Sequence, residues 1–323
     1  MSLRGSLVNR MLQYLGVFVI AATINFVLPR LMPGNPLALL AGVEVGTMTP
    51  AERAQVVQEA GLDRPLWQQY ARYLQNVVRL DFGYSYRQKR PIADMILERL
   101  PWTLLLAGVS LFISAVIGIV LGGISAWNRA KAIDVGMLWT MIALESVPTF
   151  WLGMMLISVV SVRLGWLPSF GISTPGIPLT GWERVVDIAR HLMLPVLTLS
   201  VISAPGIFVT MRYAMLNVLG EDFIRTARAK GLAERAVLFR HVVRNALVPV
   251  ATVLALRLGF AFGGAVVTET VFSFPGIGRL TFEAVSGRDY PVMQACFMVV
   301  TGAVLVSSLA VDLIYPLLDP RTR

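Results

Sequence analysis

The chain has 323 residues, of which 56% are hydrophobic and only 15% are charged, whereas soluble domains average about 45–50% and 25%. This balance excludes an ordinary soluble globular protein. The single cysteine excludes a disulfide framework, and the two isolated histidines do not form a paired metal site on one helix face. We therefore expect no metal and no cofactor bound by the chain itself.

Long apolar stretches predict membrane-spanning helices. Four uncharged stretches have about the 20 residues that cross a bilayer as a helix, namely 11–29, 100–128, 192–211 and 290–311. Two further stretches, 135–162 and 245–268, are equally apolar but contain one charge each, Glu145 and Arg257. The sequence thus predicts six transmembrane helices. The first stretch follows a basic leader as a signal peptide would, but its 19 residues exceed the usual apolar length of about 7–15, so a retained helix is expected.

The basic residues predict the orientation of the chain. The two termini, the turn at 129–131 and the loop at 212–244 together hold 13 Lys or Arg, whereas the short loops at 163–191 and 269–289 hold five. By the positive-inside rule both termini are expected in the cytoplasm. Membrane insertion accounts in this way for the net charge of +9, and nucleic acid is not expected as a partner.

The 31–99 segment predicts a small helical insertion on the outer face. A capping box at 49–52 and a stop signal at Gly61 predict one helix. A second helix is predicted to start near Pro65, and a third over 91–100 leads into the second span. Two roles stay open for this insertion, a lid over the helix bundle and direct contact with a substrate.

The 212–245 segment carries the signals of a short capped helix. The acidic Glu221 and Asp222 precede an alanine-rich stretch that ends at Gly231. A second short helix over 234–244 would complete a helix–turn–helix parallel to the membrane. The basic residues would also suit an interfacial helix on anionic lipid. The first helix lacks a bulky apolar stripe, however, so a protein cleft is the better partner.

Glu145 and Arg257 are predicted to lie at the same depth in the membrane. Glu145 is about eleven residues from the start of its span at Asp134, and Arg257 is about twelve from Asn245, so both are roughly 17–18 Å deep. Buried charges usually pair or face a cavity. Two hypotheses remain open, an ion pair on a transport pathway that opens to meet a zwitterionic peptide, and a permanent pair that only fixes helix packing. Pro148 marks a point where the third span can be discontinuous.

The segment from Glu221 to Pro249 resembles the cytoplasmic coupling loop of ABC-importer permeases from the dipeptide, oligopeptide, nickel and glutathione branch. It reads EDFIRTARAKG and then HVVRNALVP. Similar motifs follow one another along nearly the whole chain: PGNP at 33–36, GLDRP at 61–65, DFGYS at 81–85, TETVF at 268–272, FPGIGR at 274–279, RDYP at 288–291 and DPR at 319–321. Two positions depart from the branch, with Asn35 for its usual Asp and Asp319 for its usual Asn.

The resemblance implies an all-α membrane protein with the type I ABC-importer permease fold. The expected parts are an N-terminus with the first helix (1–30), the external insertion (31–99), a core with the coupling loop (100–318) and a cytoplasmic tail (319–323). In that family the loop sits in a groove of a separate ATP-hydrolysing subunit. The residues that the resemblance assigns to this coupling are Glu221, Asp222, Phe223, Arg225, Thr226, Ala227, Arg228, Ala229, Lys230, Gly231, His241, Arg244 and Asn245. Within it, Ala227 and Ala229 would allow close approach of the partner, and Gly231 a left-handed turn.

The expected function is that of a transport subunit and not of an enzyme. It would carry di- and oligopeptides from an external binding protein across the bacterial inner membrane, together with a second homologous permease and two ATP-binding subunits. Because the chain has no GxxxxGK[ST] motif, those subunits would use the ATP and Mg²⁺. Glutathione, nickel or an oligosaccharide are alternative substrates. A self-sufficient ion-coupled transporter is a weaker alternative, since it predicts an inverted repeat and several intramembrane carboxylates.

Overall fold

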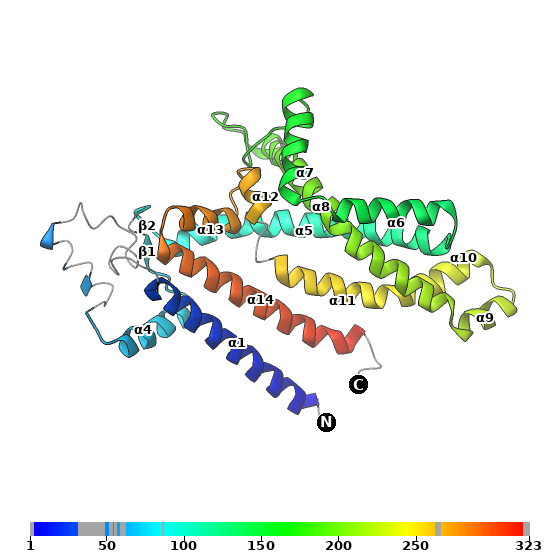
Figure 1. Cartoon of the computed structure of the whole chain (residues 1–323), viewed down its shortest axis with the longest axis horizontal. Helices are drawn as coiled ribbons and strands as arrows, with labels where there is room; N and C mark the ends of the chain where they lie inside the picture. The colour runs from blue at the N-terminus through cyan, green and yellow to red at the C-terminus, as the bar shows by residue number, and fades with distance from the viewer. Residues whose placement is uncertain are drawn as a thin grey trace. The chain divides into compact units, whose positions relative to one another are not determined.

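The computed structural model describes residues 3–31, 49–51, 54, 57–58, 63–85, 87–261 and 266–318, which are almost entirely helical (Figure 1). The motif at 33–36, Glu52 and Gly61 of the first expected outer helix, and the tail at 319–323 lie outside the described residues. The chain divides into two compact units. Unit 1 comprises Met1–Leu104, Phe262–Val266 and Pro275–Leu309, and unit 2 comprises Leu105–Ala261, Val267–Phe274 and Ala310–Arg323.

Unit 1 is built from helices and one two-residue hairpin. Its elements are α1 (Leu3–Leu31), α4 (Leu66–Val78), β1 (Tyr84–Ser85), β2 (Arg90–Pro91), the first part of α5 (Ile92–Trp127), α13 (Ile277–Ser286) and most of α14 (Tyr290–Leu318). The strands are antiparallel, with Tyr84 opposite Pro91. The main apolar cluster of this unit combines the start of α5 with α13 and α14.

Helix α4 confirms the prediction of a helix that starts near Pro65, which is its N-cap residue. It packs on α1 because its buried Val77 joins Ala22 in one apolar cluster. Polar contacts fix the same pair of helices, since the hydroxyls of Thr23 and Tyr70 lie 2.7 Å apart. The second outer helix is therefore held against the first span and is not a free linker.

Helix α5 joins two elements that the sequence suggested separately. The helix expected over 91–100 and the span expected over 100–128 form one uninterrupted helix with Pro101 inside it. Burial of Ile92 and its neighbours against α13 supports the helix on the N-terminal side of the proline. Thr103, two residues beyond it, accepts a hydrogen bond of 2.8 Å from the backbone N–H of Ile277 and so satisfies a free donor at the start of α13.

Unit 2 contains the remaining helices. They are the rest of α5, α6 (Ala132–Glu145), α7 (Thr149–Leu156), the π-helix η2 (Ile157–Arg163), α8 (Gly181–Leu219), α9 (Asp222–Ala229), α10 (Glu234–Ala236), the π-helix η3 (Val237–Val243), α11 (Arg244–Ala261) and most of α12 (Val266–Val271). Helix α8 packs extensively against α11, α6 and α7. Five helices of the described chain are long and apolar enough to span a membrane.

The sixth candidate span is broken. Helix α6 and the α7–η2 segment pass the same test together, but they are bent by 95° at the short break after Glu145. Pro148 is the N-cap residue of α7 and has extended backbone angles of φ −62° and ψ 132°. Proline has no backbone N–H to donate to the preceding helix and disfavours helical angles in the residue before it, so it favours a break. The expected discontinuity at Pro148 is confirmed, and the six predicted spans appear as five continuous helices and one bent pair.

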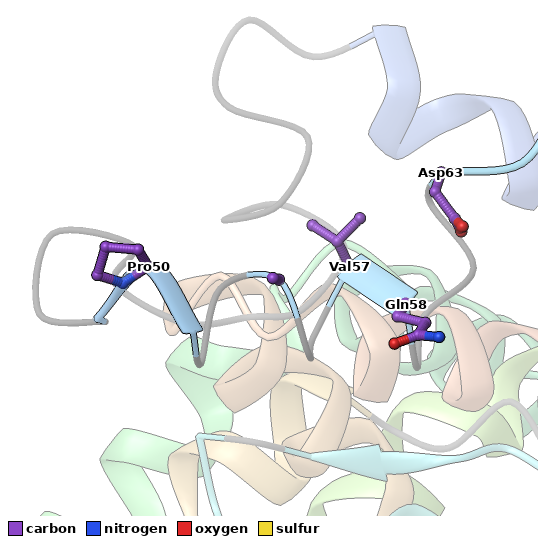
Figure 2. A pocket seen from close by; sticks show the side chains of 5 residues that line it. Pro50, Val57, Gln58 and Asp63 are labelled. Atoms are coloured by element: carbon purple, nitrogen blue, oxygen red, sulfur yellow. The ribbon is translucent and has the colours of Figure 1, made fainter.

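A hollow of about 500 Å³ lies among the short described stretches that follow the first span (Figure 2). Its lining consists of Pro50, Ala54, Val57, Gln58 and Asp63. These residues belong to the segment expected on the outer face, and most of the chain between them is outside the described residues.

Candidate functional site

Helix α9 confirms the short helix predicted after Glu221, although the Glu221 side chain makes no capping hydrogen bond. Glu221 is its N-cap residue, with extended backbone angles of φ −74° and ψ 146°, and Asp222 lies in the first turn while Arg228 lies in the last. These charges complement the helix dipole. The Glu221 carbonyl accepts a hydrogen bond from the backbone N–H of Ile224 at 3.1 Å. In Figure 1, α9 lies at the end of α8 and beside α10.

The end of α9 is a Schellman turn built on Gly231. Its φ of +76° is left-handed, a conformation that glycine adopts without strain. The N–H of Leu232 bonds to the carbonyl of Ala227 at 3.3 Å, and the N–H of Gly231 bonds to the carbonyl of Arg228 at 2.9 Å. This pair of bonds defines the motif. The predicted left-handed stop at Gly231 is therefore confirmed.

The two faces of α9 have different environments. Ile224 and Ala227 are 0% and 6% exposed and belong to an apolar cluster that includes Met215 of α8. The residues on the other face are exposed, namely Phe223, Arg225, Thr226, Ala229 and Lys230. Ala227 was expected to allow close approach of a partner, but it packs against its own chain. Ala229 is on the side where a partner has access.

An exposed ion pair connects α9 to the helix that follows it. The guanidinium of Arg228 donates to both carboxylate oxygens of Glu234, with Nε–Oε1 and Nη2–Oε2 distances of 2.9 and 3.2 Å. Such a two-point contact restricts the orientation of both side chains. The turn around Gly231 is thus closed by a side-chain contact as well as by its backbone.

The expected separate helix over 234–244 is wrong. Residues from Glu234 onward form α10, η3 and α11 without a break, and Glu234–Arg257 passes as one candidate span. The helix stays continuous because buried side chains follow one side of it. Val237 and Val242 are five residues apart, and the π-helical register of η3 places them on this same side. His241 is half-buried in η3, whereas Arg244 and Asn245 at the start of α11 are exposed.

A buried ion pair that the sequence analysis missed lies near the end of α8. Arg212 donates from Nε and Nη2 to the two carboxylate oxygens of Asp134, at 2.8 and 2.9 Å. Asp134 is 2% exposed and Arg212 is 9% exposed. The hydroxyl of Ser125 and the backbone N–H of Ala130 also donate to this carboxylate. In the sequence both charges stand at the edges of apolar stretches, so each had the appearance of an ordinary flanking charge.

Comparison with known proteins identifies the family. Residues 118–323 match "Binding-protein-dependent transport system inner membrane component", and residues 3–107 match the N-terminal part described as "Binding-prot-dependent transport system membrane comp, N-term". The chain belongs to this family of importer permeases. It is therefore a multi-pass transport component of an inner membrane and not the catalytic subunit of its ABC system. Membership implies ATPase and binding-protein partners.

The permease is similar over nearly its whole length to permease proteins named for oligopeptide, dipeptide and glutathione transport systems. It is 37% identical over 316 residues to the oligopeptide transport system permease protein AppB of Bacillus subtilis (strain 168), with 98% of each chain covered. It is 36% identical to the dipeptide transport system permease protein DppB of Escherichia coli (strain K12), with 95% of each chain covered. The glutathione transport system permease protein GsiC of the same strain is 37% identical, with 98% of each chain covered.

Solved structures show the fold of the permease. A chain from "Inward facing conformations of the MetNI methionine ABC transporter" has a TM-score of 0.58 at 19% identity and covers 71% of the permease and 98% of its own length. A chain from "Crystal structure of an amino acid ABC transporter with histidines" has a TM-score of 0.52 at 15% identity, with 69% and 93% covered. The expected all-helical ABC-importer permease fold is confirmed.

The permease does not bring Glu145 and Arg257 together in this conformation. Glu145 is exposed at the end of α6. Arg257 of α11 donates to the carbonyl of Ser203 in α8 at 3.1 Å, and its guanidinium occupies the space that a Cβ at Gly206 would need. None of the ion pairs found among the described residues joins the two charges. Their pairing stays a prediction.

A hollow of about 330 Å³ adjoins helix α9 of the permease. It is lined by the end of α5, the end of α8 and α9, through Ala126, Trp127, Arg129, Leu216, Leu219, Gly220 and Arg228. In the described parts of the chain, no group of three or more His, Cys, Asp or Glu has the arrangement of a metal site.

Proposed function

We propose that the permease imports short peptides, taking them from an external binding protein and using ATP hydrolysed by partner subunits. The observation that carries the proposal is helix α9, a short capped helix with its inner face locked into unit 2 and its outer face exposed. Similarity over at least 95% of the chain to permeases named for oligopeptides and dipeptides supports the substrate class.

The outer face of α9 is suited to a protein groove. It combines one aromatic side chain, Phe223, with the cations Arg225 and Lys230 and the small Ala229. The aromatic ring supplies apolar contact area, the cations supply polar contacts at the rim, and the small residue permits close approach of another backbone. Two ATP-binding subunits would hold this helix and its counterpart on a second homologous permease. The side of the membrane that holds α9 and both termini would be the cytoplasm, in line with the distribution of Lys and Arg.

Arg257 is a candidate for contact with the substrate. It is half-buried within a candidate span, where a charge is costly unless it has a partner or faces water. Its partner in this conformation is a backbone carbonyl, so the guanidinium keeps donors for a carboxylate. The carboxyl terminus of a peptide is such a group. Glu145, exposed at the bend of the third span, is the matching candidate for the peptide amine.

Reconstitution tests the transport proposal. The complete importer, with its second permease, ATPases and binding protein, is placed in liposomes, and uptake of radiolabelled dialanine is measured. We expect accumulation that requires ATP and that other dipeptides inhibit. Uptake of glutathione with no uptake of dialanine would assign the permease to the tripeptide substrate named for its relative GsiC. Uptake by this chain alone under an ion gradient would contradict the ABC mechanism.

Cross-linking tests the docking of α9. A cysteine replaces Ala229 in a variant whose single native cysteine, Cys296, is replaced by alanine. We expect a cross-link to the ATPase subunit. The matched control carries its cysteine at Trp182, which is 77% exposed near the start of α8. That start is expected on the outer side, so the control should give no cross-link to the ATPase. Equal cross-linking at both positions would contradict the docking assignment.

A further inference from the structure

The buried pair of Asp134 and Arg212 joins three parts of unit 2. Asp134 lies in the first turn of α6, and its carboxylate also binds the hydroxyl of Ser125 near the end of α5. Arg212 lies in the last third of α8. Arg212 lies seven positions before the end of α8 at Leu219, about 10 Å of helix, and α9 begins three residues later. The pair is thus close to the coupling helix along the chain.

The hydrogen bonds of this carboxylate are complete. Oδ1 accepts from Arg212 Nε and from Ser125, and Oδ2 accepts from Arg212 Nη2 and from the N–H of Ala130. Arg212 Nε also lies 3.1 Å from the Ser125 hydroxyl oxygen. A buried pair with both oxygens satisfied has a single favourable geometry, and removal of either partner leaves an uncompensated charge. The contact therefore opposes rotation or sliding of α8 relative to the α5–α6 turn.

Close backbone packing also fixes α5 against α8 at a second place. Gly118 and Gly122 of α5 face α8, and a Cβ at these positions would lie 2.7 Å from the Cβ of Ile207 and 2.6 Å from the carbonyl oxygen of Phe208. Such close approach is typical of small residues spaced by four along a membrane helix. Helices α5 and α8 are consequently in contact through their backbones, and the Asp134–Arg212 pair secures the end of that contact.

Helix α9 is fixed to the same body. Ile224 and Ala227 share one buried cluster with Met211 and Met215 of α8, and Met211 precedes Arg212 directly. A force on α9 therefore reaches the end of α8 through packed side chains. From there, the ion pair leads to α6, whose far end at Glu145 is the bend of the third span.

We propose that Asp134 and Arg212 are positioning residues that make α5, α6 and the end of α8 move as one body with the coupling helix α9. This inference rests on the proposed docking of α9. A pair that only stabilises the fold would affect the amount of assembled importer, whereas a positioning pair affects how much transport each hydrolysed ATP produces in importer that has assembled.

The first test measures coupling in the complete importer. Asp134→Asn keeps the shape of the side chain but removes its charge, and Arg212→Lys keeps the charge but removes the two-point contact. For assembled importer we expect the ATP hydrolysed per dialanine imported to rise roughly tenfold in Asp134→Asn, and by less in Arg212→Lys. The control is Asp187→Asn near the other end of α8, which removes a carboxylate bound to the N–H and hydroxyl of Thr174 at 2.8 and 2.7 Å. We expect its ratio to equal that of the wild type.

The second test measures the movement directly and needs no substrate. Spin labels are attached to cysteines at Thr140 on α6 and at Asn217 near the end of α8, both exposed, with Cys296 replaced by alanine. In importer that keeps both Asp134 and Arg212, the distance between the labels should be the same without nucleotide and with ATP and vanadate. In Asp134→Asn and Arg212→Lys it should broaden and differ between the two states. The result that overturns the proposal is a wild-type distance and a wild-type coupling ratio in both variants.

Failure of the docking assignment is recognised separately. The Ala229 cross-link to the ATPase is measured in the same samples. Its absence in otherwise wild-type importer refutes the docking of α9. A normal cross-link together with unchanged coupling in the Asp134 and Arg212 variants refutes the positioning role alone. If Asp134→Asn does not assemble, Arg212→Lys decides between the two outcomes, because it retains a positive charge beside the carboxylate.

Discussion

The hydroxyl of Ser85 donates a hydrogen bond to the carboxylate of Asp289 across 204 positions of sequence. Both side chains are buried, at 0% and 1% exposure. Asp289 directly precedes α14, and its other oxygen lies 3.5 Å from the N–H of Val292 in the first turn. Two of the motifs noted in the sequence, DFGYS and RDYP, thus meet at one point. Their shared role in unit 1 is to fix the short β-hairpin to the start of α14.

Ser85→Ala should destabilise unit 1, because it leaves a buried carboxylate oxygen without its donor. We expect a loss of about 1–3 kcal/mol, seen as a lower temperature of thermal unfolding in detergent. Ser146→Ala is the control, since Ser146 is exposed and bonds only within its own turn. Equal unfolding temperatures for the two variants would show that the Ser85 contact does not contribute to the stability of unit 1.

Gly231→Ala should weaken coupling without removing the permease from the membrane. The φ of +76° at this position costs a residue with a Cβ about 1–2 kcal/mol, so the turn after α9 should shift. ATP hydrolysis per imported substrate should rise, and Gly231→Asn should restore part of the coupling, because asparagine tolerates this conformation. Gly136→Ala, in open space on α6, should leave coupling unchanged. Normal coupling in Gly231→Ala would contradict the role of the turn.

Large substitutions on the two faces of α9 should have different effects. Ala229→Trp adds bulk on the exposed face and should reduce co-purification of the ATPase while the unfolding temperature stays near that of the wild type. Ala227→Leu overfills the buried cluster and should lower stability by about 1–3 kcal/mol. The two readouts are measured on the same preparations. If both variants still bind the ATPase as the wild type does, α9 is excluded as the contact.

Gly122→Ala should disturb the packing of α5 on α8, whereas its neighbour Gly123→Ala should not. A Cβ at Gly122 would lie 2.6 Å from the carbonyl oxygen of Phe208, whereas a Cβ at Gly123 would lie at an ordinary 3.5 Å from the sulfur of Met215. We expect a destabilisation of about 1–3 kcal/mol for the first and little change for the second. Thermal unfolding of the two variants, which differ by one position, measures the contact directly.

A double-mutant cycle on Glu145 and Arg257 decides whether they act together. Because Arg257 binds the Ser203 carbonyl in this conformation, we expect the losses of transport in Glu145→Gln and Arg257→Gln to add within about 0.5 kcal/mol. Transport rates of the two single variants and the double variant supply the cycle. A larger coupling energy would show that the two charges act together in another state of the transport cycle, by direct contact or through one peptide bound to both.

The spans and helix α9 followed from the sequence because their signals are local. A membrane helix needs only a long apolar stretch, and the stop after α9 needs only Gly231 one residue beyond the C-cap Lys230. The break at Pro148 also has a local signal, because proline lacks a backbone N–H donor and disfavours helical angles in the residue before it, although tertiary packing keeps α5 continuous through Pro101. Each of these features depends mainly on residues within the segment that contains it.

Tertiary structure decided which side chains meet. The contact of Asp134 with Arg212 depends on the rotation of α8 against the α5–α6 turn, and the burial of Ala227 depends on which face of α9 meets α8. The continuous helix from Glu234 likewise depends on packing, because Val237 and Val242 share a buried side only when the register is π-helical. The sequence predicts where each helix lies along the chain. The rotation of a helix about its own axis is set by tertiary packing, and this rotation decides which side chains come into contact.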